Sequence, residues 1–492
     1  MLALASSCVG CGATETPADR PPAKAAAAAA KVKTPARAQA PSVAASPAAT
    51  LAPVGGTEET SSPPSRENST SAAAADASPK VAAPAALPPI DEAKVEAQGI
   101  RKLAGEHLTL YTDLPLDDEI EALPEAFDQA YPQWRSYFGL AGRDERPWRV
   151  VGRLMNDDAK FRAAGLLPDE LPQFVYGYAR NDEIWWREQP SAYYRRHLML
   201  HEGTHSFMYA NFGTCGPPWY MEGMAELLGT HSFVDGKLTL DVFPKSRGDV
   251  PYWGRVKTVL DAIKAGQPLS LDEVLNLEPG LHSPVAHYGW CWATTAFLDG
   301  HPRYRERFRR LPAELREQDF NDRLKRVFAE DWSDLNEEWQ CFVFDLDYGY
   351  DLTRSAIEFT AGQVLAAGGK RVTIEAARGW QSTGIRLESG KKYVLKAAGR
   401  YQIAAQGRIW WSEPNGVTIR YHGGRPLGML LAAVHPDPYD PAMVSSLLSP
   451  VEIGLGAELT PDKTGTLYLR VNDSPAELAD NAGTATVEVT AD

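Results

Sequence analysis

The stretch His201-Glu-Gly-Thr-His205, followed after a short loop by Trp219-Tyr-Met-Glu222-Gly-Met-Ala-Glu226, decides how the middle of this chain folds. Two histidines four positions apart on a helix project from one face about one turn apart, so that two imidazole nitrogens can meet one ion. The glutamate directly after the first histidine then lies beside the ion, where it can deprotonate water. The pentapeptide therefore predicts a helix that carries a metal site.

The flanking sequence is typical of a helix around this pentapeptide. Pro190-Ser191 is a start signal, and Gly213 with Gly216-Pro217-Pro218 is a firm stop. Apolar positions between these signals supply a buried face, namely Tyr194, Leu198, Phe207 and Met208. His197 lies one turn before His201, but ligands at i, i+4 and i+8 would extend about 12 Å along the axis, too far for one ion. We interpret His197 as a packed or supporting histidine.

A catalytic zinc site needs a third protein ligand and leaves its fourth position for water. Glu222 is the candidate third ligand, and Glu226, one helical turn further on, can hydrogen-bond a ligating histidine. The plainer interpretation is a surface helix with two solvated histidines, followed by an acidic second helix. The order of the required residue types favours the metal site.

Together these two segments resemble the gluzincins, the thermolysin-like and aminopeptidase-like zinc peptidases, and in particular their peptidase MA-like bacterial members. The resemblance implies that His201, His205 and Glu222 hold zinc and that Glu202 acts as the general base. It also implies that Glu226, four residues beyond the third ligand, supports a histidine. The sixteen residues between His205 and Glu222 are slightly fewer than in the aminopeptidases.

Hydrolysis through a tetrahedral intermediate needs a hydrogen-bond donor for the developing oxyanion. Tyr288 is the candidate, because Ala286-His-Tyr288-Gly-Trp resembles the stretch that carries this tyrosine in the aminopeptidase-like gluzincins. His287 and His231 are the other candidates. The plainer interpretation of Tyr288 is a core tyrosine that opens a buried helix.

Gly177-Tyr-Ala-Arg-Asn181 resembles the Gly-x-Met-Glu-Asn segment with which related aminopeptidases grip a free amino terminus. Arg180 stands in the place of the acidic residue, and ordinary strand sequence is the alternative interpretation. The basic side chain favours an endopeptidase over an aminopeptidase.

The whole chain has 492 residues, of which 44% are hydrophobic and 23% charged, enough for two ordinary domains and a tail. Its net charge of -14 argues against nucleic acid or an anionic membrane surface as the main partner. No apolar run approaches the about 18 residues of a transmembrane helix, so none is expected. Cys215, Cys291 and Cys341 allow one disulfide or none, and buried, inert thiols are the default expectation.

Residues 1–12, with a small residue before Cys8 and before Cys11, resemble the end of a bacterial lipoprotein export signal, truncated at its start. A two-cysteine metal or redox pair is the alternative, but no second pair completes a zinc site. Residues 13–88 are rich in Ala, Pro, Ser and Thr and predict a disordered linker, with a marginal Ala-rich helix at 24–33. We therefore expect an exported protein, either secreted or held at the cell envelope by a lipid anchor.

Residues 89–350 predict an α+β domain, and the gluzincin resemblance implies that it is of zincin-like metallopeptidase type. Strand patterns lie at 107–112, 148–154, 174–179, 184–186, 232–234 and 237–241. Helical patterns lie at 117–138, 158–166, 256–263 and 288–298, and the segment 331–343 resembles the closing helix of the gluzincins. In that family the last strand before the metal helix borders the cleft and can pair with an extended peptide.

Residues 356–492 change to strand-like runs divided by Gly, Pro, Asn and Asp turns, which predicts an all-β sandwich or jelly roll. The runs lie around Ile374 and at 394–397, 417–421, 428–434, 465–471 and 484–489. The segment 471–483 resembles the loop of the calcium-dependent galactophilic bacterial lectins. The resemblance implies calcium ligands at Asp473, Asp480 and Asn481, and hard oxygen donors suit this ion.

Two further observations bear on the lectin resemblance. Glu477 and Leu478 depart from the family pattern, and an Asn/Asp-rich turn in an accessory sandwich is the alternative interpretation. Trp410 and Trp411 offer a platform on which a sugar can stack, although paired aromatic residues are common in a β core.

These features predict an exported zinc metallopeptidase that cleaves protein or peptide substrates, glycosylated ones included, and that carries a C-terminal carbohydrate-binding module. Zinc lowers the pKa of water in this mechanism, and Glu202 accepts the proton. One alternative is a carbohydrate-binding or surface scaffold protein with a non-cleaving zincin fold, but a scaffold has no need for the base at Glu202. A zinc hydrolase of non-peptide bonds is a further alternative.

Overall fold

The structure is a computed structural model that describes residues 89–143, 147–277, 284–316, 319–405 and 407–492. The predicted signal at 1–12 with Cys8 and Cys11, the linker at 13–88 and its helix at 24–33 lie outside the described residues. All described residues fall within one compact unit, Pro79–Asp492.

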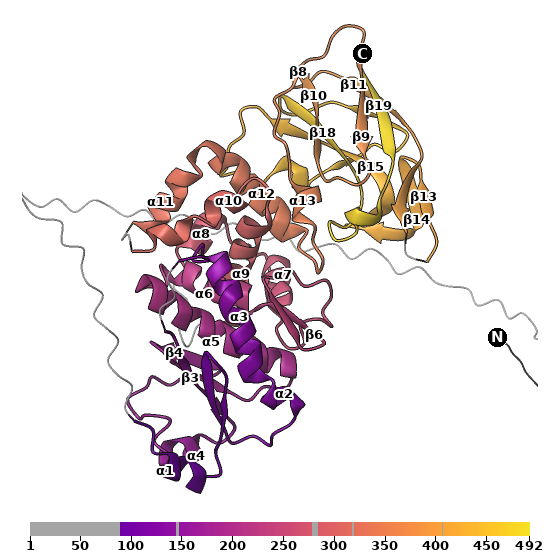
Figure 1. Ribbon diagram of the computed structural model, residues 1–492. Helices are drawn as coiled ribbons and strands as arrows, with labels where there is room; N and C mark the ends of the chain where they lie inside the picture. Colours follow the sequence, from indigo (N-terminus) through magenta and orange to yellow (C-terminus); the bar gives the residue numbers. More distant parts are fainter. Residues whose placement is uncertain (1–88, 144–146, 278–283, 317–318, 406) are drawn as a thin grey trace, which may run out of the picture. The chain divides into compact units, whose positions relative to one another are not determined.

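A five-stranded sheet and its connecting helices form the beginning of this unit (Figure 1). The elements are α1 (Glu92–Ala97), β1 (Arg101–Ala104), β2 (Leu108–Thr112), α2 (Asp118–Glu121), α3 (Leu123–Tyr137), β3 (Val150–Met155), α4 (Asp158–Ala163), β4 (Gly177–Arg180) and β5 (Glu183–Arg187). The strand order is β1-β2-β3-β5-β4. Strands β2, β3 and β5 are parallel, whereas β1 and β4 are antiparallel to their neighbours. Strand β4 therefore lies at one edge of the sheet.

The single helix predicted at 117–138 is divided into α2 and α3. Asp117 caps α2 by accepting a hydrogen bond from the Ile120 N–H at 2.8 Å. Pro124, at the start of α3, lacks the backbone N–H that would continue the first helix, so the chain begins a second one.

The predicted metal helix is α5 (Ala192–Phe212), and α6 (Pro218–Gly229) follows it. The Ser191 side chain caps α5 by accepting a hydrogen bond from the Tyr194 N–H at 3.1 Å. Gly213 ends the helix in the left-handed conformation, with a φ of 74°. Both ends coincide with the start and stop signals in the sequence.

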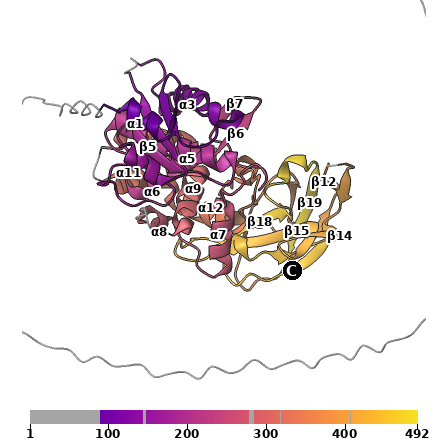
Figure 2. The ribbon, with the colours of Figure 1, turned by 90° about the horizontal axis from the view of Figure 1, so that it is seen from below.

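The remaining elements of the helical region are β6 (His231–Val234), β7 (Lys237–Leu240), α7 (Arg255–Lys264), α8 (Leu271–Leu275), α9 (Val285–Gly300), α10 (Arg305–Phe308), α11 (Phe320–Val327), α12 (Trp332–Phe344) and α13 (Leu352–Ser355). Short 3-10 turns lie at Leu311–Glu314 and Ala329–Asp331. Helices α5, α6 and α9 lie side by side (Figures 1 and 2). One hydrophobic core joins them to the sheet and α12, and its fully buried side chains include Trp134, Trp219, Trp290 and Trp339.

Strands dominate from residue 363 onward. They are β8 (Gln363–Val364), β9 (Lys370–Glu375), β10 (Gln381–Leu387), β11 (Tyr393–Ala398), β12 (Tyr401–Ala404), β13 (Trp410–Ser412), β14 (Asn415–His422), β15 (Arg425–Pro436), β16 (Val451–Glu452), β17 (Gly456–Leu459), β18 (Gly465–Val471) and β19 (Thr484–Ala491). One sheet has the order β14-β15-β18-β10-β8, with β16 beside β15, and another has the order β17-β11-β19-β9. Ile385 and Leu467 from the first sheet share a buried core with Leu395 and Val487 from the second. The zincin-like and jelly-roll assignments stay predictions.

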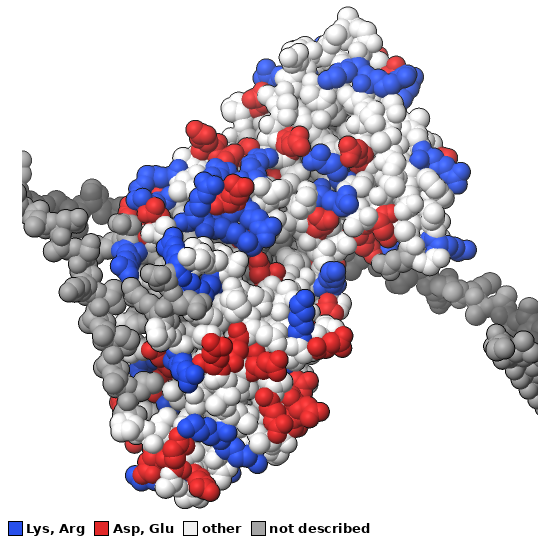
Figure 3. All heavy atoms as spheres, in the orientation of Figure 1, with Lys and Arg blue, Asp and Glu red and all other residues white. Residues whose placement is uncertain are grey.

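Charged side chains of both signs are interspersed on the face shown in Figure 3. Basic side chains from α10 and the turns around it are paired with acidic ones, namely Arg303 with Asp334, Arg307 with Asp331, and Arg309 with Asp299. Cys215, Cys291 and Cys341 are free thiols, and Cys291 is buried. Within the described ranges, no helix combines the length and apolar character needed to cross a membrane.

Candidate metal centre

Three side chains from α5 and α6 converge on one point. His201 Nε2 lies 3.2 Å from Glu222 Oε2 and 3.2 Å from His205 Nε2, and His205 Nε2 lies 3.5 Å from Glu222 Oε2. Ligand atoms about 2.0–2.2 Å from a tetrahedral zinc ion lie about 3.3–3.6 Å from one another, so these atoms fit three corners of such a site. The structure thus brings together the three residues that the sequence predicts as zinc ligands.

The electrostatic interactions among these three side chains are strong because little solvent reaches them. Burial opposes the ionisation of Glu222, but His205 and His201 outweigh it and lower the pKa of Glu222 to about 2. Burial also opposes the charged form of His205, whereas the Glu222 carboxylate raises the pKa of His205 well above its usual range. The arrangement therefore favours a positive charge among the three side chains, carried by protons or by a divalent ion.

The three residues open onto a cleft of about 400 Å³. Its other lining residues are Gly177, Tyr178, Ala179, Arg180, Asn181, Glu202, Ser206, Tyr209, Cys215, Met221 and Tyr288. Glu202 is buried, and burial raises the pKa of its carboxyl group although His201 and His205 oppose that shift. A raised pKa suits a carboxylate that accepts a proton and later returns it.

Strand β4 forms one wall of the cleft, whereas β5, the last strand before α5, contributes none of the described lining residues, so the strand at the cleft is not the one that the gluzincin resemblance implies. A Cβ atom at Gly177 would lie 2.3 Å from Glu202 Oε1, so the close approach of strand and carboxylate requires glycine. The Arg187 N–H donates to the Tyr176 carbonyl at 2.9 Å. Hydrogen-bonded pairs alternate along an antiparallel ladder, so the N–H and C=O groups of Gly177 and Ala179 point away from β5.

Arg180 adds a basic side chain to this wall of the cleft. Its guanidinium donates to Glu183 Oε2 at 2.9 Å and lies 5.3 Å from the ring of Trp185. Glu183 also accepts a hydrogen bond at 2.6 Å from the buried Arg153. One carboxylate is thus shared by two guanidinium groups, so Glu183 is not a partner of Arg180 alone.

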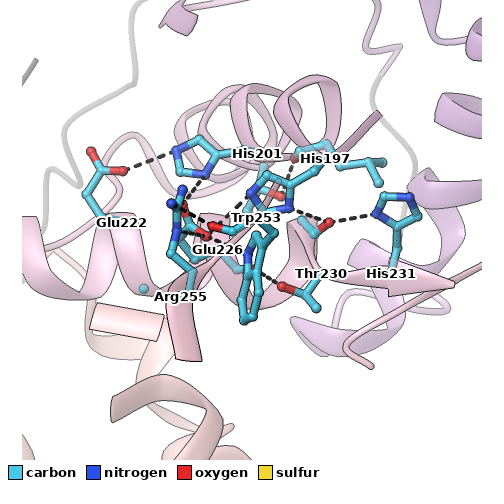
Figure 4. Close-up of polar contacts among 12 residues, drawn as sticks. His197, His201, Glu222, Glu226, Thr230, His231, Trp253 and Arg255 are labelled. Atoms are coloured by element: carbon cyan, nitrogen blue, oxygen red, sulfur yellow. Dashed lines mark hydrogen bonds and ion pairs between the residues drawn. The ribbon is translucent and has the colours of Figure 1, made fainter. Parts of the chain in front are cut away.

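Glu226 contacts the other imidazole nitrogen of His201 (Figure 4). Its Oε1 lies 3.5 Å from His201 Nδ1 and accepts from Arg255 Nη2 at 2.7 Å, and its Oε2 accepts from Arg255 Nε at 3.0 Å and Trp253 Nε1 at 3.2 Å. Burial opposes the ionisation of Glu226, but Arg255 and then His197 hold its pKa well below its usual range. The sequence predicts Glu226 as a supporting carboxylate, whereas no motif marks Trp253 or Arg255.

His197 is the packed, supporting histidine that the sequence predicts. Its Nδ1 lies 2.9 Å from the Gly229 carbonyl oxygen and its Nε2 lies 3.4 Å from Glu226 Oε2. His197, His201 and Glu226 are close enough to form a second group of ligands. Arg255 binds both oxygens of Glu226, however, and its charge repels a cation there, so we interpret this group as a support for His201.

Tyr288, the candidate oxyanion donor, lies in the first turn of α9 and lines the cleft. The centroid of its ring lies 6.4 Å from that of His201, and Arg255 Cζ lies 5.8 Å from the Tyr288 centroid. Burial, followed by the charge of Glu222, raises the pKa of the Tyr288 hydroxyl above its ordinary value. The hydroxyl therefore keeps its proton and can donate it to an oxyanion.

The two other oxyanion candidates are placed less favourably. His231 Nδ1 lies 2.8 Å from the Gly229 carbonyl oxygen, and its Nε2 accepts from Arg196 Nε at 3.0 Å. Burial lowers the pKa of His231 to about 3, which keeps the ring neutral. Neither His231 nor His287 belongs to the described residues that line the cleft.

Two of the three predicted calcium ligands, Asp473 and Asn481, contact each other, and Asp480 precedes Asn481 in the chain. Asp473 is 1% exposed, and its Oδ2 accepts a hydrogen bond from Asn481 Nδ2 at 2.9 Å. Asp480 Oδ2 accepts from the Ala405 N–H at 3.0 Å. The Oδ1 atoms of Asp480 and Asn481 are buried without a hydrogen-bond donor from the described part of the chain. Burial raises the pKa of Asp473 to about 6.

Residues near this loop show two departures from the lectin expectation. Glu477 is engaged by Arg420, which contacts both carboxylate oxygens, at 2.7 and 2.6 Å. Trp410 packs against the β core, whereas Trp411 is 47% exposed with Arg400 Cζ 5.3 Å from its ring. The two tryptophans therefore do not form one exposed platform.

Comparison with known proteins places the chain in no family. No family model matches it, and neither does a curated protein. Among solved structures, the chain is similar to the EclA N-terminal domain, a PllA-like lectin, with 19% identity and a TM-score of 0.20 over 25% of this chain and 95% of that chain. It is also similar to an aminopeptidase N family protein from Idiomarina loihiensis, with 11% identity and a TM-score of 0.27 over 80% of this chain and 68% of that chain. Both TM-scores are low, so neither match indicates the function of this chain.

Proposed function

We propose that this chain is an exported zinc metallopeptidase of the gluzincin type that cleaves within protein or peptide substrates. The observation that carries the proposal is the set of three ligand atoms 3.2–3.5 Å apart beside a buried glutamate in one cleft. Because His201 and His205 lie on one helix and Glu222 on a helix packed against it, the site is held on rigid elements.

Each residue of the centre has a defined role in this proposal. His201, His205 and Glu222 would hold zinc, which supplies a Lewis acid that lowers the pKa of water toward neutrality. Glu202 accepts the proton of the attacking water and returns it to the leaving amine. The Tyr288 hydroxyl donates to the oxyanion that develops on the scissile carbonyl.

The wall of the cleft supports binding of an extended peptide through internal residues of the peptide. The N–H and C=O groups of Gly177 and Ala179 point outward, so an extended peptide can hydrogen-bond to them as an additional strand of the sheet. The positive charge of Arg180 disfavours a free amino terminus nearby. Both features support an endopeptidase over an aminopeptidase.

Metal content and hydrolysis of an unfolded protein substrate test this proposal. We expect about one zinc ion per chain, loss of zinc in Glu222→Ala, and retained zinc with hydrolysis lowered by about 1,000-fold or more in Glu202→Gln. A Glu202→Gln variant that still hydrolyses peptide bonds contradicts the mechanism. Zinc binding without peptide hydrolysis by the wild type would instead favour a scaffold protein or a hydrolase of other bonds.

A second candidate function concerns the sheet-rich region. We propose that Asp473, Asp480 and Asn481 bind calcium and that this region binds carbohydrate on the substrate or the cell surface. The two buried Oδ1 atoms without hydrogen-bond donors support this, because calcium prefers hard oxygen ligands. Calcium titration of the wild type and of Asp473→Asn, followed by a glycan array with calcium or chelator, tests it. No calcium binding at millimolar concentration would contradict the proposal.

A further inference from the structure

A buried series of polar contacts leads from the first residue of α7 to the metal centre (Figure 4). Arg255 contacts both carboxylate oxygens of Glu226, and Glu226 in turn lies 3.5 Å from His201 Nδ1. Arg255 is 5% exposed and Glu226 is 1% exposed. A two-point contact between a planar guanidinium and a carboxylate fixes the carboxylate in its plane as well as its position.

We propose that Arg255 is a positioning residue of the metal centre, which acts through Glu226 to orient His201 and thereby sets the affinity for zinc. The inference rests on the proposed function, because zinc is the ion that His201 is proposed to hold. Without Arg255, the Glu226 carboxylate would be a buried group with an incomplete set of partners, and it would be free to turn. It would then no longer hold the Nδ1 side of the His201 ring in place.

The backbone before α7 is shaped for this contact. Gly254 caps the helix with a φ of 67°, a left-handed conformation that glycine adopts without strain. This turn directs the side chains on either side of it, Trp253 and Arg255, to the same oxygen of Glu226, at 3.2 and 3.0 Å. Arg255 also donates to the Trp253 carbonyl at 3.1 Å, which holds the guanidinium in place.

Zinc affinity is the direct measure of this role. Arg255 also lies near the ring of Tyr288, so a loss of activity alone would not separate an effect on His201 from an effect on the oxyanion donor. Loss of a group that orients a metal ligand typically costs 10–100-fold in metal affinity. If Arg255 acts on zinc affinity through Glu226, replacing Arg255 should have no further effect on zinc affinity once the Glu226 carboxylate has been removed.

The experiment measures the zinc dissociation constant of the full chain by competition with a chelating dye. The variants are Arg255→Lys, Arg255→Met, Glu226→Gln and the double variant Glu226→Gln/Arg255→Met. We expect Arg255→Met to weaken zinc binding by about 10–100-fold and Arg255→Lys to recover part of that loss, because lysine keeps the charge but not the planar fork. The double variant should bind zinc as Glu226→Gln does. Arg196→Met is the matched control, since Arg196 is equally buried on α5 but contacts Glu119 and His231 instead.

The double variant and Arg255→Lys keep the test decisive if Arg255→Met does not fold, because the first removes both buried charges together and the second retains them. Zinc binding by Arg255→Lys that equals the wild type would overturn the inference. A double variant that binds zinc much more weakly than Glu226→Gln would overturn it as well. A wild-type chain that binds no zinc would contradict the proposed function itself, whereas unaffected variants of a zinc-binding wild type contradict only the role of Arg255.

Discussion

At the scale of single residues, the proposed general base depends on a glycine from another element. A Cβ atom at position 177 would lie 2.3 Å from Glu202 Oε1 and 2.9 Å from Cδ, so Gly177→Ala must displace the carboxylate. Displacement of a catalytic group by about 1 Å can cost about 100-fold in rate, and we expect kcat/KM to fall by about 10–100-fold. Zinc content should not change, because Glu202 is not a proposed ligand.

Measurement of kcat/KM and bound zinc checks this prediction. Gly368→Ala is the matched control, since a Cβ there meets nothing within 4 Å. Gly177→Ala with wild-type kcat/KM would show that Glu202 can work from another position.

Asp241 carries a pH-dependent part of the free energy of unfolding. Burial and the charge of Asp299 raise the pKa of Asp241 from 3.8 to about 7, although Arg309 at 2.8 Å opposes the shift. A raised pKa means that the protonated carboxyl is the form that stabilises the fold. This contribution is fully present below pH 3.8 and is lost as the pH rises through about 7.

We therefore expect the free energy of unfolding of Asp241→Asn to increase relative to that of the wild type as the pH rises from 5 to 8. The gain should be about 1–2 kcal/mol, a discounted share of what a shift of this size represents. Asparagine accepts the φ of 56° at this position, so the substitution adds no backbone strain. Urea unfolding at both pH values measures the difference, with Asp235→Asn as control because Asp235 has a φ of 51° and is exposed. Parallel pH profiles of wild type and Asp241→Asn would contradict the prediction.

The ligands of the candidate site could be predicted because their geometry is local. His201 and His205 are related by one helical turn, and Glu222 and Glu226 by another, so spacing alone places them on common faces. Arg255 and Trp253 could not be predicted. Their contact with Glu226 depends on the path of β6, β7 and the left-handed Gly254, none of which leaves a motif.

At the scale of elements, boundaries were predictable wherever a side chain or a glycine sets them. The start of α5 at Ser191 and its end at Gly213 are such cases. The sequence does not predict strand β10 (Gln381–Leu387), because Gln381, Ser382 and Gly384 have little strand character of their own. Pairing with β18 makes this segment a strand.

The cap of α5 should contribute to the stability of the protein but not to metal binding. Ser191 Oγ accepts from the Tyr194 N–H at 3.1 Å and donates to the Pro251 carbonyl at 3.2 Å. We expect Ser191→Ala to lower the free energy of unfolding by about 1 kcal/mol, because one N–H of the first turn loses its acceptor. Ser191→Thr should retain most of the stability that the cap contributes, because threonine keeps the hydroxyl.

Urea unfolding and zinc titration of both Ser191 variants check this prediction. The zinc dissociation constant should stay at the wild-type value, since the ligands begin nearly three helical turns further on. Weakened zinc binding in Ser191→Ala would mean that the first turn of α5 helps to position the ligands.

At the scale of the whole molecule, the sequence indicates a change of character between residues 350 and 356, and strands do replace helices there. Composition could not show how the two regions contact each other. Glu337 of α12 is 1% exposed, and it accepts hydrogen bonds from Ser445 Oγ at 2.5 Å and from His435 Nε2 of β15 at 2.7 Å. These partners are about a hundred residues apart in the chain, beyond the reach of local patterns.

This buried contact predicts that the helical and sheet-rich regions unfold together. Removing Glu337 leaves the buried Ser445 hydroxyl and the half-buried His435 ring without their acceptor, which costs about 1–3 kcal/mol for the buried hydroxyl and less for the ring. We expect one calorimetric transition for the wild type, with zinc release at the same temperature. Glu337→Ala should lower the first melting temperature and divide the transition in two, because the contact that couples the regions is weakened. Glu330→Ala, at an exposed position just before α12, should melt as the wild type does. A wild type that already melts in two steps would show that the regions are independent domains, as the shift in composition alone suggests.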